Sequence, residues 1–136
     1  KRLQEIILPD NLQKLGNYAF MDCDSLKKID IPTNVKLIGQ YAFDGCNNIT
    51  SIGLPDGLSE IGENAFSGCR NLQNINIPQN VKKIGKDAFN GCSSLKQITV
   101  PNSITTIEDY LFASCMELES INIPDNIEKI GDGAFS

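Results

Sequence analysis

The chain contains no histidine and no tryptophan, and its apolar residues never form a long run. Without histidine, a Ser/His/Asp or Cys/His nucleophile cannot be assembled, and zinc loses its commonest nitrogen ligand. The apolar runs are only a few residues long, whereas a transmembrane helix needs about 20 apolar residues. We therefore expect no nucleophile of these types, no metal site and no direct insertion into a membrane.

Positive charge is also scarce, because 12 basic residues stand against 17 acidic ones, giving a net charge of −5. Nucleic-acid binding needs basic patches that contact phosphates, so this balance argues against a nucleic-acid partner. The carboxylates form no convincing acid/base pair, and no glycine-rich phosphate loop is present. The sequence predicts a protein that is not an enzyme and that uses no cofactor.

The sequence consists of one 23-residue unit that is repeated nearly six times. A fixed period of 20–50 residues is the signature of a solenoid, in which each repeat packs only on its neighbours. We therefore expect one repeat domain over residues 1–136, with about six coils. Three columns show the period most clearly: Pro9, Pro32, Pro55, Pro78, Pro101 and Pro124; Phe20, Phe43, Phe66, Phe89, Phe112 and Phe135; and Cys23, Cys46, Cys69, Cys92 and Cys115.

Within each unit the apolar pattern changes from one kind of structure to another. The alternation Ile29-x-Ile31 predicts a short strand, and stacked strands would form a parallel sheet along one face of a right-handed coil. Pro32 ends that strand because it has no N–H for the ladder. Residues 35–39 cross back and are a candidate second short strand. Residues 39–46 are too short for an ordinary helix, so we expect a helical or 3₁₀ turn there.

The unit Leu26-x-x-Ile29-x-Ile31-Pro32-x-x-Val35-x-x-Ile38-Gly39-x-x-Ala42-Phe43-x-x-Cys46 resembles the BspA-like subclass of leucine-rich repeats. The resemblance covers essentially the whole chain and implies a leucine-rich-repeat solenoid. It also implies adhesion or binding of a protein partner, such as a host matrix or receptor protein, at a cell surface. An intracellular interaction scaffold, a structural spacer and a glycan-binding module stay open as alternatives.

The five cysteines follow the repeat and so belong to one column. Stacked coils would place neighbouring cysteines about 5 Å apart, within disulfide range, but parallel inward side chains have unsuitable Cβ directions. A line of thiols also does not converge as zinc ligands must. We expect buried free thiols that act as small apolar side chains, with no disulfide.

One repeat departs from the pattern, because Glu108 replaces the usual glycine and Leu111 the usual alanine. The glycine column indicates either a positive φ or a close approach of two backbones. We favour the close approach, with Glu108 simply pointing outward. Leu111 needs extra room, so we expect this coil to bulge.

Two columns that flank the strand isoleucines vary between repeats and should face solvent. They are small, polar and rich in amides, although they lack the aromatic and arginine anchors of tight interfaces. They are either a ligand-binding face or merely soluble strand residues, and any contact would gain strength from many repeats through avidity. The candidate binding residues are Lys28, Asp30, Ser51, Asn74, Asn76, Gln97, Thr99, Ser120 and Asn122.

Other features concern the remaining surface and the two ends. Tyr18 and Tyr41 share a column and are expected to pack against the turns, and Lys82, Lys83 and Lys86 form a local basic spot. The repeat already runs at the first residues and is interrupted at the last, so we expect a piece of a longer array that can associate end to end. We expect an extracellular or cell-surface location, with an intracellular one still open.

Overall fold

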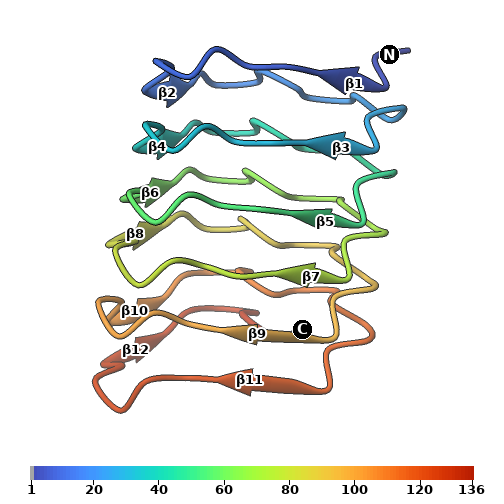
Figure 1. The fold of residues 1–136 in the computed structure, drawn as a ribbon. Helices are drawn as coiled ribbons and strands as arrows, with labels where there is room; N and C mark the ends of the chain where they lie inside the picture. The colour runs from blue at the N-terminus through green and yellow to red at the C-terminus, as the bar shows by residue number, and fades with distance from the viewer. Residues whose placement is uncertain (1) are drawn as a thin grey trace.

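The computed structural model describes residues 2–136, which form six stacked coils with two short strands each (Figure 1). The odd-numbered strands lie along one side of the stack and the even-numbered strands along another, and all pairs are parallel. The odd-numbered strands are β1 (Glu5–Ile6), β3 (Lys28–Ile29), β5 (Ser51–Ile52), β7 (Asn74–Ile75), β9 (Gln97–Thr99) and β11 (Ser120–Asn122). The even-numbered strands are β2 (Lys14–Leu15), β4 (Leu37–Ile38), β6 (Glu60–Ile61), β8 (Lys83–Ile84), β10 (Thr106–Ile107) and β12 (Lys129–Ile130). The predicted parallel solenoid, with a second short strand in each coil, is confirmed.

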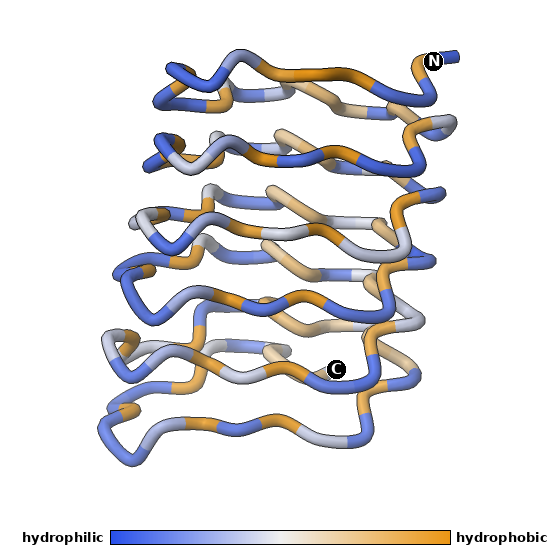
Figure 2. The backbone as a smooth tube through the Cα atoms, viewed as in Figure 1, coloured by the Kyte–Doolittle hydropathy of each residue, from blue (hydrophilic) through white to orange (hydrophobic). Residues whose placement is uncertain are grey.

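The strands pair in a register of one full repeat, so each side chain stacks on its counterpart in the next coil. Ile6 is opposite Ile29, and Leu15 is opposite Ile38. Apolar residues therefore recur at the same place in every coil (Figure 2). Along each strand they alternate with polar ones, as at exposed Lys28 and buried Ile29. This register forms one continuous core between the two sides of the stack.

The phenylalanine column provides the largest side chains of that core. Neighbouring rings are stacked at centroid distances of 5.3–5.8 Å along the whole column. Phe43, Phe66 and Phe89 have at most 1% of their surface exposed. Because burial of an aromatic side chain is a large favourable contribution, this column ties successive coils together.

The expected helical or 3₁₀ turn is wrong, because residues 2–136 contain only hydrogen-bonded turns between the even and odd strands. Two positions in each of the first five of these segments adopt a left-handed backbone, as at Tyr41 (φ 56°) and Gly45 (φ 69°). Such residues interrupt a right-handed helix. The signal was present in the sequence, since the same two columns hold Asn64 and Gly68 in the third coil, and asparagine and glycine tolerate positive φ.

The glycine column that contains Gly39 and Gly85 is explained by close backbone approach. None of its φ angles is positive. A Cβ on Gly85 would lie 2.4 Å from the Glu63 backbone nitrogen in the preceding coil. The steric interpretation made from the sequence is therefore confirmed.

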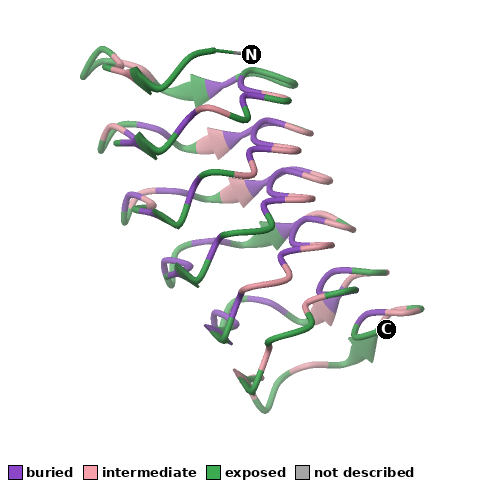
Figure 3. Cartoon of the chain, turned by 90° about the vertical axis from the view of Figure 1, so that its right-hand side faces the viewer, coloured by how far each residue is buried: buried purple, intermediate pink, exposed green. Residues whose placement is uncertain are grey.

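Within residues 2–136, the even-strand side of the stack is interrupted once, between the fourth coil (β7 and β8) and the fifth (β9 and β10), at a junction that we call the seam. The even-strand sheet runs in the order β2-β4-β6-β8, and β10 pairs only with β12. On the odd-strand side β7 and β9 share no paired residues, and neither do β3 and β5, which meet only in an isolated bridge between Asp30 and Gly53. Figure 3 shows the wider gap on the even-strand side of the stack, before the last two coils. The distortion expected for the coil that carries Glu108 and Leu111 takes the form of a separation from the preceding coil on the even-strand side.

Candidate functional site

The nine residues predicted for the binding face all lie exposed on, or directly after, odd-numbered strands. The structure gathers seven of them around a groove of about 460 Å³, whose lining also includes Gly53 and the strand residues Ile52, Ile75 and Ile98. We call this the sheet-face groove. The seven residues are Ser51, Asn74, Asn76, Gln97, Thr99, Ser120 and Asn122.

The remaining two predicted residues lie apart from this groove. Lys28 and Asp30 line a smaller hollow of about 200 Å³ over β1 and β3. Their side chains form an ion pair with 3.2 Å between Nζ and Oδ2, and both are largely exposed. Exposed pairs of this kind contribute roughly 0–1 kcal/mol, so this pair does not bring the two residues into the main groove.

The sheet-face groove is polar and uncharged. No charged or aromatic residue lines it. Within it Asn122 Nδ2 donates a long hydrogen bond of 3.4 Å to Thr99 Oγ1. The amides of Asn74, Asn76 and Gln97 make no side-chain hydrogen bond with any residue that the structure describes. The groove therefore presents free donors and acceptors on β7, on the residue that follows it and on β9.

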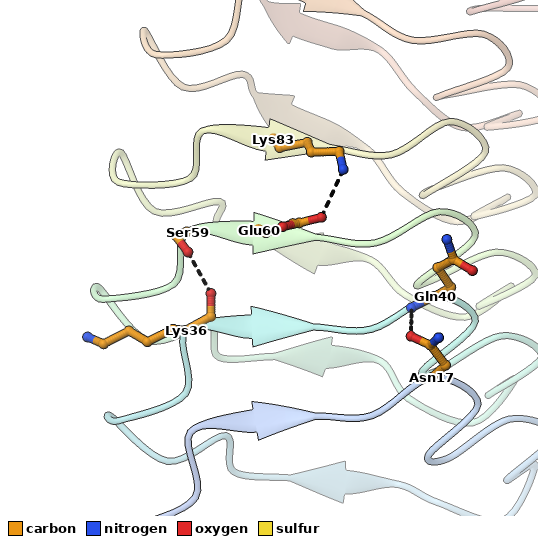
Figure 4. Close-up of polar contacts among 6 residues, drawn as sticks. All are labelled: Asn17, Lys36, Gln40, Ser59, Glu60 and Lys83. Atoms are coloured by element: carbon orange, nitrogen blue, oxygen red, sulfur yellow. Dashed lines mark hydrogen bonds and ion pairs between the residues drawn. The ribbon is translucent and has the colours of Figure 1, made fainter.

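Amides elsewhere on the surface are used in the stack itself. Asn80 Nδ2 donates to the carbonyl of Asp56, and Asn126 Nδ2 donates to the carbonyl of Asn102, both at 2.8 Å. Near the turns, Asn17 Oδ1 accepts a hydrogen bond of 2.9 Å from the Gln40 backbone N–H (Figure 4). These side chains join neighbouring coils, so they are less available to a ligand than the free amides of the groove.

The basic spot predicted at Lys82, Lys83 and Lys86 is largely paired. Lys83 Nζ lies 3.0 Å from the carboxylate of Glu60 in the preceding coil (Figure 4), and Lys86 Nζ lies 3.9 Å from that of Glu63. This pairing lowers the net positive charge of the spot. An acidic partner would therefore find little free charge at this place.

The tyrosine column packs as rings lying one on another. Tyr18 and Tyr41 are stacked with centroids 5.2 Å apart and planes 11° from parallel. Tyr18 is 53% exposed, since no ring covers its outer face within the described coils. The contact is a structural one between turns, as expected, and it lies outside the sheet-face groove.

All five cysteines are free, with four buried and Cys115 half-buried. They are more than apolar fillers, because the Cys46 thiol donates to the carbonyl of Phe20 at 3.1 Å, and the thiols of Cys69, Cys92 and Cys115 repeat this contact. Burial raises the pKa of the Cys46 thiol to about 12 and that of Cys115 to about 11. Thiolates, the reactive form, are therefore disfavoured in the folded coils. Residues 2–136 contain no group of three or more side chains placed to ligate a metal.

Comparison with known proteins identifies the class of protein. The family model for the BspA type leucine rich repeat region, in six copies, matches residues 1–85. The chain belongs to this family, and the leucine-rich-repeat solenoid predicted from its sequence is confirmed. No curated protein sequence matches the chain.

Solved structures of leucine-rich repeat proteins share this fold. The Treponema pallidum leucine rich repeat protein TpLRR is 29% identical, with a TM-score of 0.74 over 96% of this chain and 74% of its own. A leucine rich cell surface protein from Faecalibacterium prausnitzii is 25% identical, with a TM-score of 0.87 over 100% of this chain and 45% of its own. The pneumococcal vaccine antigen PcpA is 25% identical, with a TM-score of 0.74 over 99% of this chain and 34% of its own. The chain thus spans less than half of the last two proteins. No helix in residues 2–136 is long and apolar enough to cross a bilayer.

Proposed function

We propose that this chain is a non-catalytic protein-binding module that contacts its partner through the sheet-face groove. The observation that carries the proposal is the set of free amides on Asn74, Asn76 and Gln97 around a hollow of about 460 Å³. A polar surface without charges can pair with the main chain and polar side chains of a partner protein. Ligand recognition of this kind depends on a few well-placed hydrogen-bonding groups.

We further propose that the module acts in adhesion at a cell surface, in an extracellular location. The likeness to a Faecalibacterium cell surface protein and to a pneumococcal antigen supports this location. Groove contacts without aromatic or arginine anchors are expected to be weak in one module. Binding by a longer array would then gain strength because several modules engage at once.

The test is binding of the folded chain to immobilised extracellular matrix proteins and glycans. The test variant carries Asn74→Ala, Asn76→Ala, Gln97→Ala and Thr99→Ala, all on exposed groove positions. A matched control carries Gln13→Ala, Lys14→Ala, Glu128→Ala and Lys129→Ala, which are exposed positions on and beside even-numbered strands. Circular dichroism and urea midpoints establish that both variants stay folded.

Saturable binding to a matrix protein that is lost in the groove variant and kept in the control supports the proposal. Binding only to glycans would identify a glycan-binding module instead. If the folded chain binds nothing on the array, a structural spacer is the better interpretation. Equal loss in both variants would remove the groove from consideration.

A further inference from the structure

We propose that Glu108 and Leu111, which lie outside the groove, open the sheet-face groove by separating the fourth and fifth coils. This inference rests on the proposed function, because it concerns the shape of the same groove. In every other coil the two positions are glycine and alanine, from Gly16 and Ala19 in the first coil to Gly131 and Ala134 in the last. Glu108 and Leu111 are therefore positioning residues for the groove.

The first step of the argument is steric. At Gly39, Gly62, Gly85 and Gly131, an added Cβ would meet backbone of the preceding coil at 2.4–2.7 Å. Real Cβ atoms are not found so close to other heavy atoms, so the two coils must move apart. Glu108 has a Cβ at this position in the fifth coil. The fourth and fifth coils consequently cannot approach as closely as the others do.

The hydrogen bonds between coils confirm that they do not on the even-strand side. Gly85 N–H donates to Ile61 O at 2.9 Å and Lys82 N–H donates to Ser59 O at 2.8 Å, whereas the equivalent bonds from Glu108 and Thr105 are missing. The Cα atoms of β8 and β10 are everywhere more than 8 Å apart, although paired strands lie about 4.8 Å apart.

Leu111 adds side-chain volume to the core at the same junction. It is fully buried in a column that otherwise holds Ala42, Ala65, Ala88 and Ala134. The rings on both sides of Phe112 are 5.8 Å away, compared with 5.3–5.5 Å in the earlier coils. The coils remain joined at the turns, where Phe89 N–H donates to Leu111 O at 3.1 Å, and beside the odd strands, where Lys96 N–H donates to Gln73 O over a long 3.5 Å. The larger side chain therefore acts as a wedge in the core.

The sheet-face groove lies across this seam. Asn74 and Asn76 line it from β7 and its following residue, and Gln97 and Thr99 line it from β9, the two strands that do not pair. Over the regularly paired β1 and β3, the hollow on the same face is less than half as large, at about 200 Å³. A partner would thus contact two rows of free amides. The distance between the rows depends on Glu108 and Leu111, which lie outside the groove.

The experiment is the double variant Glu108→Gly/Leu111→Ala, which restores the repeat pattern and leaves every groove residue in place. We expect the amides of residues 105 and 108 to exchange with solvent at least about tenfold more slowly than in the parent chain, as they gain ladder hydrogen bonds. NMR shifts of Asn76 and Gln97 should also change, and binding to the matrix array should fall at least about tenfold, because the rows of amides no longer match the partner. Glu108→Ala is the matched control: it keeps the Cβ, so exchange at residue 105 should stay fast.

Several results would overturn the proposal. One is slower exchange at residues 105 and 108 without any shift change on β7 and β9. Another is full binding by the double variant when the four-alanine groove variant has lost it. Closure of the seam by Glu108→Ala would show that the carboxylate, and not the Cβ, holds the coils apart. If the groove variant itself binds normally, the proposed function fails, while the exchange and shift data still decide whether these two residues shape the groove.

Discussion

Phe66 lies at the middle of the phenylalanine column and has only 1% of its surface exposed. Its ring stacks on Phe43 at 5.4 Å and on Phe89 at 5.5 Å. Replacing a buried phenylalanine by alanine costs about 3–5 kcal/mol, as lost transfer free energy plus the cavity left behind. Each ring contact contributes about 0.5–1.5 kcal/mol of specific interaction, and Phe66→Ala removes two. We therefore expect the free energy of unfolding to fall by an amount in the upper part of that range.

Equilibrium unfolding in urea measures this loss, with tyrosine fluorescence and circular dichroism as independent probes. Phe135→Ala is the control, because Phe135 is 44% exposed and stacks on one ring only, at 5.8 Å. It should cost about 1–2 kcal/mol, since less apolar surface returns to water. Equal midpoints for the two variants would refute the reasoning that a continuous buried column holds the coils together.

Three further results are expected. Gly85→Ala should lower the unfolding free energy by about 2–4 kcal/mol, because a few ladder hydrogen bonds are lost at about 1 kcal/mol each. Gly16→Ala should not lower it, because a Cβ at Gly16 meets nothing within 4 Å. Similar urea midpoints for the two variants would contradict the close-approach argument. A thiol reagent should label the folded chain slowly and half-buried Cys115 first, and rapid labelling of all five thiols in native buffer would disprove their protection. Stability should fall as pH rises above 9, because the pKa of Cys46 is raised from 9.0 to about 12 and the unfolded chain loses its thiol protons first. The slope reaches up to about 1.4 kcal/mol per pH unit for each such thiol. Cys46→Ala should have a shallower slope in urea titrations from pH 8 to 10.5, and an unchanged slope would count against this cause.

Most of the fold could be predicted from the sequence because the repeat makes each buried column visible. Ile29 and its counterparts recur at one spacing, which identifies the strand and its inward face. Both ladders, the core and the stacked rings of the phenylalanine column follow from that register. The one clear error, the helical or 3₁₀ turn, came from reading length and apolar spacing while overlooking that Asn64 and Gly68 mark left-handed positions.

The candidate site was predicted less completely. The alternation along each strand correctly placed Asn74 and Gln97 on the exposed face. It did not distinguish Lys28 and Asp30, which form their own ion pair, from the residues of the groove. Columns show which way a side chain faces, but the depth of a groove depends on the distance between coils.

The sequence by itself determined the solenoid, the inward columns, the absence of histidine-based chemistry and the identity of the exposed residues. These properties depend on spacing and residue type, which a 23-residue period displays directly. Only the tertiary structure decided where the stack separates, which amides remain unpaired and where they surround a groove. Those properties depend on how closely backbones 23 residues apart can approach, and that distance is set by the Cβ of Glu108 and the buried volume of Leu111 acting across coils.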